Sequence, residues 1–263
     1  MKKQIFSIIL LFCCLTGSLY GQTEADSIAI VSAQWETNVG QDGIVHKRAV
    51  IPSLYKGPQH INLVEIPKGK KLHFDIGVSK QMTPMSKLGK KFQALAAING
   101  SFYNMKKPYN SVCYFKKHGV EEFVFNEKMA QRDNGAVAIS AKGKLSVHPA
   151  DASEPGNVAP AQTWPAALDA VSVVSSGPVL LVDGKDARLD ENSFNRNRHP
   201  RSAVGTAGKK VYLVTVDGRN AENAQGVSLW EFTKIMRWIG AEDAINMDGG
   251  GSTTLYAEGQ NGN

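Results

Sequence analysis

AINMDGGGSTTLY, residues 244–256, is the stretch that decides the fold: an apolar run stops at Asp248, three glycines follow, and a second apolar run begins. The pattern predicts a strand, a tight turn and another strand. Residues 253–256 favour a strand over a helix and no Gly-Lys-Ser/Thr follows, so the stretch is neither a dinucleotide fingerprint nor a phosphate-binding P-loop. The plain alternative is a structural turn capped by Asp248. The functional alternative is a site where backbone N–H groups meet an anion, because residues without Cβ permit that approach.

Two other apolar runs also end in polar, glycine-flanked turns. Residues 94–98, ALAAI, stop at Asn99, and residues 211–216, VYLVTV, stop at Asp217 and are followed by Gly218 and Arg219. Ligand sites tend to lie just past strand ends, on loops that a rigid scaffold holds in place. We therefore expect the three turns to share one cleft, although Asp217-Gly218-Arg219 alone is equally typical of a plain turn.

The rest of the chain predicts an α+β fold, with a strand-rich mixed β-sheet core and a few packed helices. Residues 72–78 alternate apolar and polar, as a half-buried strand does, and residues 135–148 predict a hairpin around Ala141-Lys142-Gly143. Thr83-Pro84 indicates a short helix that continues to Phe92. A second helix is predicted from the Ser228/Glu231 capping box to Gly240.

Composition fits an ordinary folded protein: 263 residues, 42% hydrophobic and 21% charged, with a net charge of +6. This surplus suits an acidic substrate but lacks the clustered basic stripe of a nucleic-acid-binding protein, so no nucleic acid partner is expected. Residues 1–21 predict a signal peptide, with two lysines before an eleven-residue apolar run that is too short to be a permanent membrane anchor. Residues 22–263 are then one exported domain, periplasmic or secreted; its oligomeric state is left open.

Metal and nucleophile motifs are missing from the sequence. The six histidines form no zinc-binding pattern and there is no G-x-S-x-G elbow, so neither a metal nor a cofactor is expected. Cys113 is the one cysteine after the predicted leader, and its strand-like surroundings favour a buried structural residue.

The candidate site combines carboxylates with arginines. Two aspartates and several guanidinium groups are what cleavage of a glycosyl phosphate requires: acid–base or nucleophilic chemistry at the anomeric carbon, and forked donors for the phosphate. The alternative for the arginines of residues 195–201 is a solvated basic loop.

Four motifs, taken together, resemble the phosphodiester glycosidase family. They are NGSFY at residues 99–103, RHPRSAVG at 198–205, VDGR at 216–219 and NMDGGGST at 246–253, within a resemblance that runs from about Glu65 to Tyr256. The resemblance implies hydrolysis of a sugar-1-phosphodiester, such as an N-acetylglucosamine-1-phosphodiester, on the sugar side. The expected products of this reaction are free sugar and a phosphomonoester.

On this basis Asp248 and Asp217 are the expected catalytic pair, with their individual roles undecided. The residues expected to bind phosphate or sugar are Arg201, Arg219, Arg198, Asn99, Asn246, Gly249, Gly250, Gly251, Ser252 and Thr253, with Glu65 and His199 as further candidates. Two rivals stay open: a non-catalytic phosphoglycan-binding module and a metal-independent phosphodiesterase that breaks the P–O bond.

Overall fold

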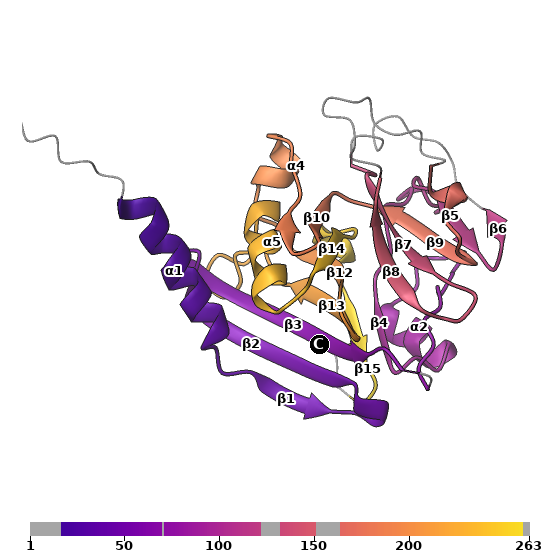
Figure 1. The fold of residues 1–263 in the computed structure, drawn as a ribbon, viewed down its shortest axis with the longest axis horizontal. Coiled ribbons are helices and arrows are strands. Elements are labelled where there is room, and N and C mark those ends of the chain that lie inside the picture. The colour runs from indigo at the N-terminus through magenta and orange to yellow at the C-terminus, as the bar shows by residue number, and fades with distance from the viewer. Residues whose placement is uncertain (1–16, 70, 122–131, 151–163, 260–263) are drawn as a thin grey trace, which may run out of the picture.

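A computed structural model describes residues 17–69, 71–121, 132–150 and 164–259. The helices are α1 (Gly17–Val31), α2 (Met85–Lys91), α4 (Ser193–Arg196) and α5 (Leu229–Trp238), with short 3-10 turns at Gln41–Gly43, Trp164–Ala167 and Gly250–Ser252. These elements surround two principal sheets, so the structure confirms the expected α+β class (Figure 1).

The large sheet has the strand order β1-β2-β3-β13-β12-β14-β10-β11. Its strands are β1 (Glu36–Val39), β2 (Val45–Leu54), β3 (Gly57–Pro67), β10 (Val179–Val182), β11 (Lys185–Asp186), β12 (Arg201–Ala207), β13 (Lys210–Val216) and β14 (Asp243–Asn246). Each ladder in the sheet is antiparallel, where the sequence had suggested a mixed sheet. The antiparallel order follows from short connections, such as the turn between β12 and β13, which cannot make a parallel crossover.

The small sheet has the order β6-β5-β9-β7-β8 and is likewise antiparallel. It consists of β5 (Phe115–Lys117), β6 (Val120–Glu121), β7 (Gly135–Ile139), β8 (Leu145–Pro149) and β9 (Ser172–Ser176). Two further strands, β4 (Ala96–Ile98) and β15 (Leu255–Ala257), form a separate pair.

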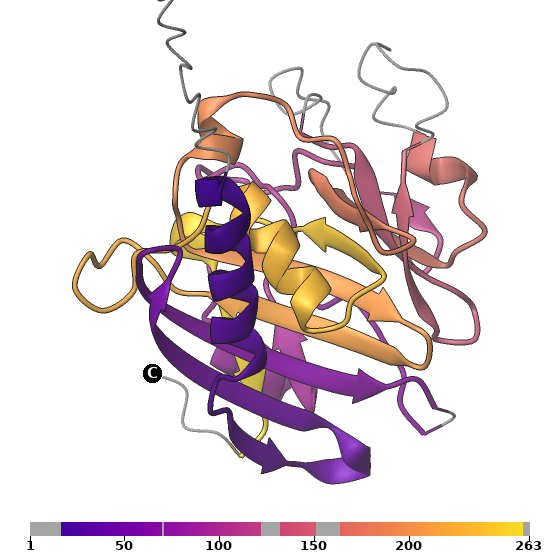
Figure 2. The ribbon, with the colours of Figure 1, turned by 60° about the vertical axis from the view of Figure 1, so that its left-hand side comes forward.

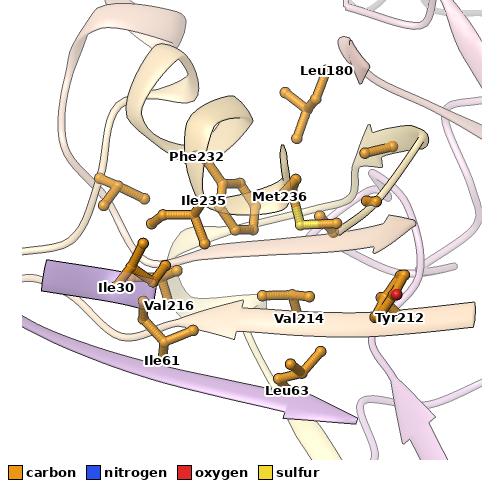
Figure 3. Packing of buried hydrophobic residues seen from close by; sticks show 14 of the residues in the cluster. Ile30, Ile61, Leu63, Leu180, Tyr212, Val214, Val216, Phe232, Ile235 and Met236 are labelled. Carbon is orange, nitrogen blue, oxygen red and sulfur yellow. The ribbon is translucent and has the colours of Figure 1, made fainter. Parts of the chain in front are cut away.

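One face of the large sheet, here called the helix-covered face, is packed by α5 and α1. The α5 residues Phe232, Ile235 and Met236 are fully buried against this face, which includes Val214 and Val216 of β13 (Figure 3). Figure 2 shows α1 lying beside α5 over β2 and β3, and Ile30 of α1 belongs to the same core. Alternation along β13 places Val211 and Leu213 on the opposite face, where a second core includes Val137 and Leu145 of the small sheet.

Local sequence signals decide several elements. The hairpin around residues 141–143 is confirmed by the β7–β8 register, and α5 begins with both hydrogen bonds of the predicted capping box. Helix α2 also forms, but Pro84, not Thr83, is its first capping residue.

The strand predicted at residues 72–78 is wrong. The even-numbered residues Leu72, Phe74 and Ile76 are indeed more buried than their neighbours, but the segment joins no ladder. Its described backbone contact is one bond from the Phe74 N–H to the Gly143 carbonyl. The alternation of apolar and polar residues indicates which side chains are buried. A strand also requires a neighbouring strand whose backbone N–H and C=O groups are free to pair with it.

The predicted leader, residues 1–21, lies largely outside the described residues. Helix α1 runs across its expected end, and Asp26 accepts a hydrogen bond from the Tyr55 N–H at 2.9 Å. In the described part of the chain, α1 and every other helix fall short of the length and apolarity that a membrane span requires. The signal peptide stays a prediction.

Candidate functional site

Two of the polar turns lie at one end of the large sheet, where β13 and β14 finish and β12 begins. This end of the strands is here called the motif edge. Strands β13 and β14 flank β12 and are both antiparallel to it, so they run in the same direction and end together. Asp217 follows the end of β13, and Asp248 follows shortly after β14. Neighbouring strands lie ~4.8 Å apart, which places the two aspartate backbones on the order of 10 Å from each other. Two of the three predicted turns therefore lie at the same end of the sheet.

Glycines allow the two turns to close on the start of β12. A Cβ added at Gly218 would lie 2.6 Å from the Pro200 nitrogen, and one added at Gly249 would lie 2.8 Å from the Pro200 carbonyl oxygen. Real Cβ atoms do not approach backbone so closely, so both positions require glycine. Pro200 thus separates the Asp217 turn from the Asp248 turn and is in contact with each.

The glycine loop, residues 248–253, is a compact turn that holds the Asp248 carboxyl. The Gly250 N–H donates to the Pro200 carbonyl at 2.9 Å, and the Gly249 N–H donates to Asp248 Oδ1 at 2.9 Å. Burial raises the pKa of Asp248 above its ordinary value, although hydrogen bonds from Ser252 and the Gly249 N–H act in the opposite direction. A carboxyl with a raised pKa in a polar turn is suited to proton transfer.

Asn99, which follows β4, braces the glycine loop. Its Nδ2 donates to the Asp248 carbonyl at 2.7 Å, while its Oδ1 accepts from Ser202 Oγ at 2.7 Å and from the Thr254 N–H at 3.1 Å. These contacts bring the third predicted turn to the motif edge. They also occupy both ends of the amide, so Asn99 positions the loop and is not arranged as the sugar ligand that was expected.

Arg219 lies against the glycine loop. Its backbone has a φ of 64°, an uncommon conformation for a residue with a side chain, and a Cβ at Gly250 would lie 2.9 Å from Arg219 Nη2. The guanidinium therefore packs on the face that Gly250 leaves open. Next to it, burial and the charges of Arg201 and Arg219 lower the pKa of His199, which favours a neutral ring.

Arg201 is at the motif edge but is almost completely buried, with 1% of its surface exposed. Its guanidinium donates to the carbonyls of Phe194, Asn197 and Val227, and no carboxylate among the described residues pairs with it. The predicted direct contact of Arg201 with phosphate is therefore corrected. Its N–H groups hold the carbonyls of the surrounding chain, and its buried positive charge contributes to the electrostatic potential at the motif edge.

A second arginine beside Arg201, the partly buried Arg132, was missed by the sequence analysis. Arg132 lies 4.1 Å from the centre of the Phe194 ring, and Arg201 lies 5.0 Å from the same ring. Burial, Arg132 and Arg219 together lower the pKa of Arg201 to about 10. No local motif marks Arg132, because residues far apart in sequence form this cation–aromatic cluster.

Asp217 differs from Asp248 in its surroundings. Its carboxyl lies 3.9 Å from His60 Nδ1, and its side chain is 50% exposed. Burial still raises its pKa, while His60 and Arg48 oppose the shift. Because Asp217 continues the β3 ladder after Val216, its side chain lies on the face opposite Val216, whereas Arg201 shares the face of Val216.

Three other candidates lie in structural contacts. Arg198 pairs with Glu231 and also donates to Gln225 and to the Tyr55 carbonyl, so it ties its loop to α5. Asn246 is fully buried and donates to the Gly177 carbonyl at 2.8 Å. Glu65 of β3 is the ladder partner of Tyr212 of β13 and forms ion pairs with Lys47 and Lys210. It therefore lies at the other end of the sheet from Asp217. We remove all three from the substrate-contacting set.

Among the described residues, three buried polar atoms near the motif edge have no hydrogen-bond partner: His199 Nδ1, Asn246 Oδ1 and Thr253 Oγ1. Others lie elsewhere, such as Trp164 Nε1 and Ser176 Oγ. Such atoms are rare in folded interiors. Within the described ranges, no group of three or more His, Cys, Asp or Glu side chains is arranged to hold a metal ion.

Comparison with known proteins now gives the family. The model of the phosphodiester glycosidase family matches residues 92–263, more than half of the chain, and this span contains all four motifs. The chain belongs to the phosphodiester glycosidase family. This is a family of hydrolases, and the assignment confirms the resemblance that the motifs carried.

Individual relatives of this phosphodiester glycosidase chain are distant. It is 32% identical over 97 residues to N-acetylglucosamine-1-phosphodiester alpha-N-acetylglucosaminidase of Bos taurus, which is 34% of this chain and 18% of that protein. The chain thus matches less than a fifth of its bovine relative.

Solved structures share its fold. A hypothetical protein from Synechocystis superposes with a TM-score of 0.59 at 16% identity, over 86% of this chain and 60% of the other. The catalytic domain of the zebrafish N-acetylglucosaminidase, auto-inhibited by its pro-peptide, gives 0.50 at 20% identity, over 85% and 72%.

Proposed function

We propose that this protein is an exported hydrolase that cleaves a sugar-1-phosphodiester on the sugar side, and that N-acetylglucosamine is the sugar. The observation that carries the proposal is the meeting of Asp248 and Arg219 at one glycine loop. Gly250 brings the guanidinium against the loop, and burial raises the pKa of the carboxyl. The named activities of relatives in the family support the sugar and the linkage.

In the proposed reaction, water adds to the anomeric carbon and the bond from that carbon to the phosphate oxygen breaks. The electron pair stays on the phosphate oxygen, so the products are free sugar and a phosphomonoester. Asp248 accepts the proton that water loses, which requires its ionised form. Phosphate is already a fair leaving group, so strong protonation of the leaving oxygen is unnecessary and one carboxyl carries most of the proton transfer.

Arg219 and the N–H groups of the glycine loop bind the phosphate. Arg201 and Arg132 contribute positive potential from below, which stabilises the charge that develops on the leaving oxygen. Asp217, with His60 beside it, lies on the other side of Pro200 and assists in orienting the substrate. Ser252 and Asn99 hold the loop and hence the Asp248 carboxyl.

The test is hydrolysis of methyl N-acetylglucosamine-1-phosphodiester in ¹⁸O-labelled water. Label in the sugar is expected; label in the phosphate would select a phosphodiesterase, and saturable binding without product would select a binding module. Asp248→Asn should reduce kcat by about 10³-fold with an unchanged melting temperature, because general acid–base catalysis contributes 10²–10⁴-fold. Asp190→Asn, at an exposed position away from the motif edge, is the matched control. Near-normal turnover in Asp248→Asn contradicts the assigned role.

A further inference from the structure

A cavity of about 1010 Å³ lies between the large sheet and the small sheet. It opens on the face of the large sheet opposite the helices, where Val204 and Leu213 form one wall. Val137 and Leu145 of the small sheet also line it, and they pack with Val204 and Leu213 in one buried cluster. The cavity volume is at the upper end of the range typical of small-molecule sites, and a mostly apolar lining is also typical of such sites.

The cavity begins at the candidate functional site. Asn99, Gly100, Gly251, Ser252 and Thr254 line one end of it, and these residues belong to the glycine loop and to its brace. The rest of the lining is largely apolar, with polar side chains such as His73, Asp75 and Gln81 among it. Because Gly251 and Ser252 border the cavity directly, a molecule bound at this part of the glycine loop is adjacent to it.

Residues 71–84 cover the other side of the cavity. Leu72, Phe74 and Ile76 face it, and this segment is held by the Phe74–Gly143 backbone bond and by Lys117, which donates to the Ile76 carbonyl and pairs with Asp75. The apolar residues of the lining offer few hydrogen-bond partners to water, and a buried water needs two to four such partners. This part of the cavity therefore suits an apolar group.

We propose that this cavity binds an apolar chain attached to the substrate phosphate, so that the substrate class is a glycosyl phosphodiester of a lipid. The proposal rests on the proposed function for the position of the phosphate. The phosphate lies at the glycine loop and Arg219, the sugar lies toward Asp248, and the alkyl or acyl chain on the other phosphate ester enters the hollow between the sheets.

The binding test uses octyl phosphate and inorganic phosphate, titrated into the full chain by calorimetry below the micelle concentration. Octyl phosphate should bind at least ~100-fold more tightly, which corresponds to burial of three to four methylene groups. Ala96→Phe, which fills the cavity from β4, should remove this gain. Ala166→Phe is the control, because Ala166 is exposed on the Trp164–Ala167 turn and does not line the cavity. If Ala96→Phe does not fold, Val137→Phe fills the same space from the small sheet.

The kinetic test compares methyl and octyl diesters of N-acetylglucosamine-1-phosphate. A KM lower by at least ~100-fold for the octyl diester in the wild type, lost in Ala96→Phe and kept in Ala166→Phe, supports the proposal. Equal KM values for the two diesters overturn it while leaving the hydrolase function intact. Tight, Ala96-dependent binding of octyl phosphate without sugar release supports the cavity and overturns the proposed reaction. Equal binding of octyl phosphate by wild type and Ala96→Phe is adsorption of a surfactant and overturns the cavity proposal.

Discussion

The helix-covered face and the motif edge of the same sheet are built by opposite rules. On the helix-covered face Phe232, Ile235 and Met236 are fully buried, and the polar groups of α5 have partners: Thr233 Oγ1 donates to the Leu229 carbonyl at 2.8 Å. At the motif edge, polar atoms such as Thr253 Oγ1 are buried without described partners, and a large cavity adjoins them. The first region is organised for stability. The second leaves packing and hydrogen bonding incomplete, as binding sites commonly do.

This difference assigns different roles to similar residues. Arg198 follows helix α4 and Arg219 follows strand β13. Arg198 is neutralised by Glu231 on the α5 side, while Arg219 packs on Gly250 at the motif edge. Asp217 and Asp248 divide in the same way: Asp217 has a histidine beside it and is half exposed, whereas Asp248 is enclosed by its own loop. Charge alone therefore does not distinguish these residues from one another; the contacts around each of them do.

The largest expected effect is on the helix-covered face. Phe232→Ala should lower the free energy of unfolding by about 3–5 kcal/mol, because it removes a fully buried ring from a filled core and leaves a void. Urea unfolding followed by circular dichroism measures this loss.

Phe74→Ala is the counterpart on the hollow side. Phe74 is only partly buried and already borders the cavity, so its truncation should cost about half as much or less. Equal losses for the two variants would show that both faces are packed to the same degree and would break the comparison.

Short-range signals in the sequence predicted much of this. The Ser228/Glu231 box and the glycine of the β7–β8 turn act within a few residues, and both elements formed as expected. The aspartates were found because apolar runs ending in glycine-flanked turns mark strand ends. What could not be read is which partner each side chain takes: Arg198 with Glu231, Asn99 with Ser202, and Arg132 on Phe194 are contacts set by the tertiary fold.

Asp133, which lies beside β9 of the small sheet, gives the next largest expected effect on the free energy of unfolding. Its side chain is buried and accepts from Ser175 Oγ at 2.9 Å. Burial raises its pKa to about 6, although hydrogen bonds from Ser175, Cys113 and the Tyr114 backbone act in the opposite direction. A folded pKa above the unfolded value of ~3.9 means that folding favours the neutral form. This contribution is fully present below pH ~4 and is lost as pH rises through about 6, a change of about 3 kcal/mol.

Asp133→Asn should therefore flatten the fall in stability between pH 4 and 7. At pH 8 the variant should be more stable than wild type by up to ~3 kcal/mol, whereas the exposed control Asp190→Asn should follow the wild-type curve. Unfolding free energies at each pH provide the measurement. A variant less stable than wild type at pH 8 would show instead that the carboxylate is needed to accept the hydrogen bonds from Ser175, Cys113 and the Tyr114 backbone.

The smallest expected effects on the free energy of unfolding come from two threonine substitutions, which separate the contribution of hydrogen bonding from that of packing. Thr233→Val on α5 removes a hydroxyl that donates to the Leu229 carbonyl and should cost about 1 kcal/mol. Thr253→Val removes a buried hydroxyl with no described partner and should cost nothing or stabilise slightly, since the hydroxyl is desolvated without compensation. The pair is measured by the same urea titration. Equal losses at both sites would mean that Thr253 Oγ1 is bonded in solution, and the motif edge would then be as complete as the helix-covered face.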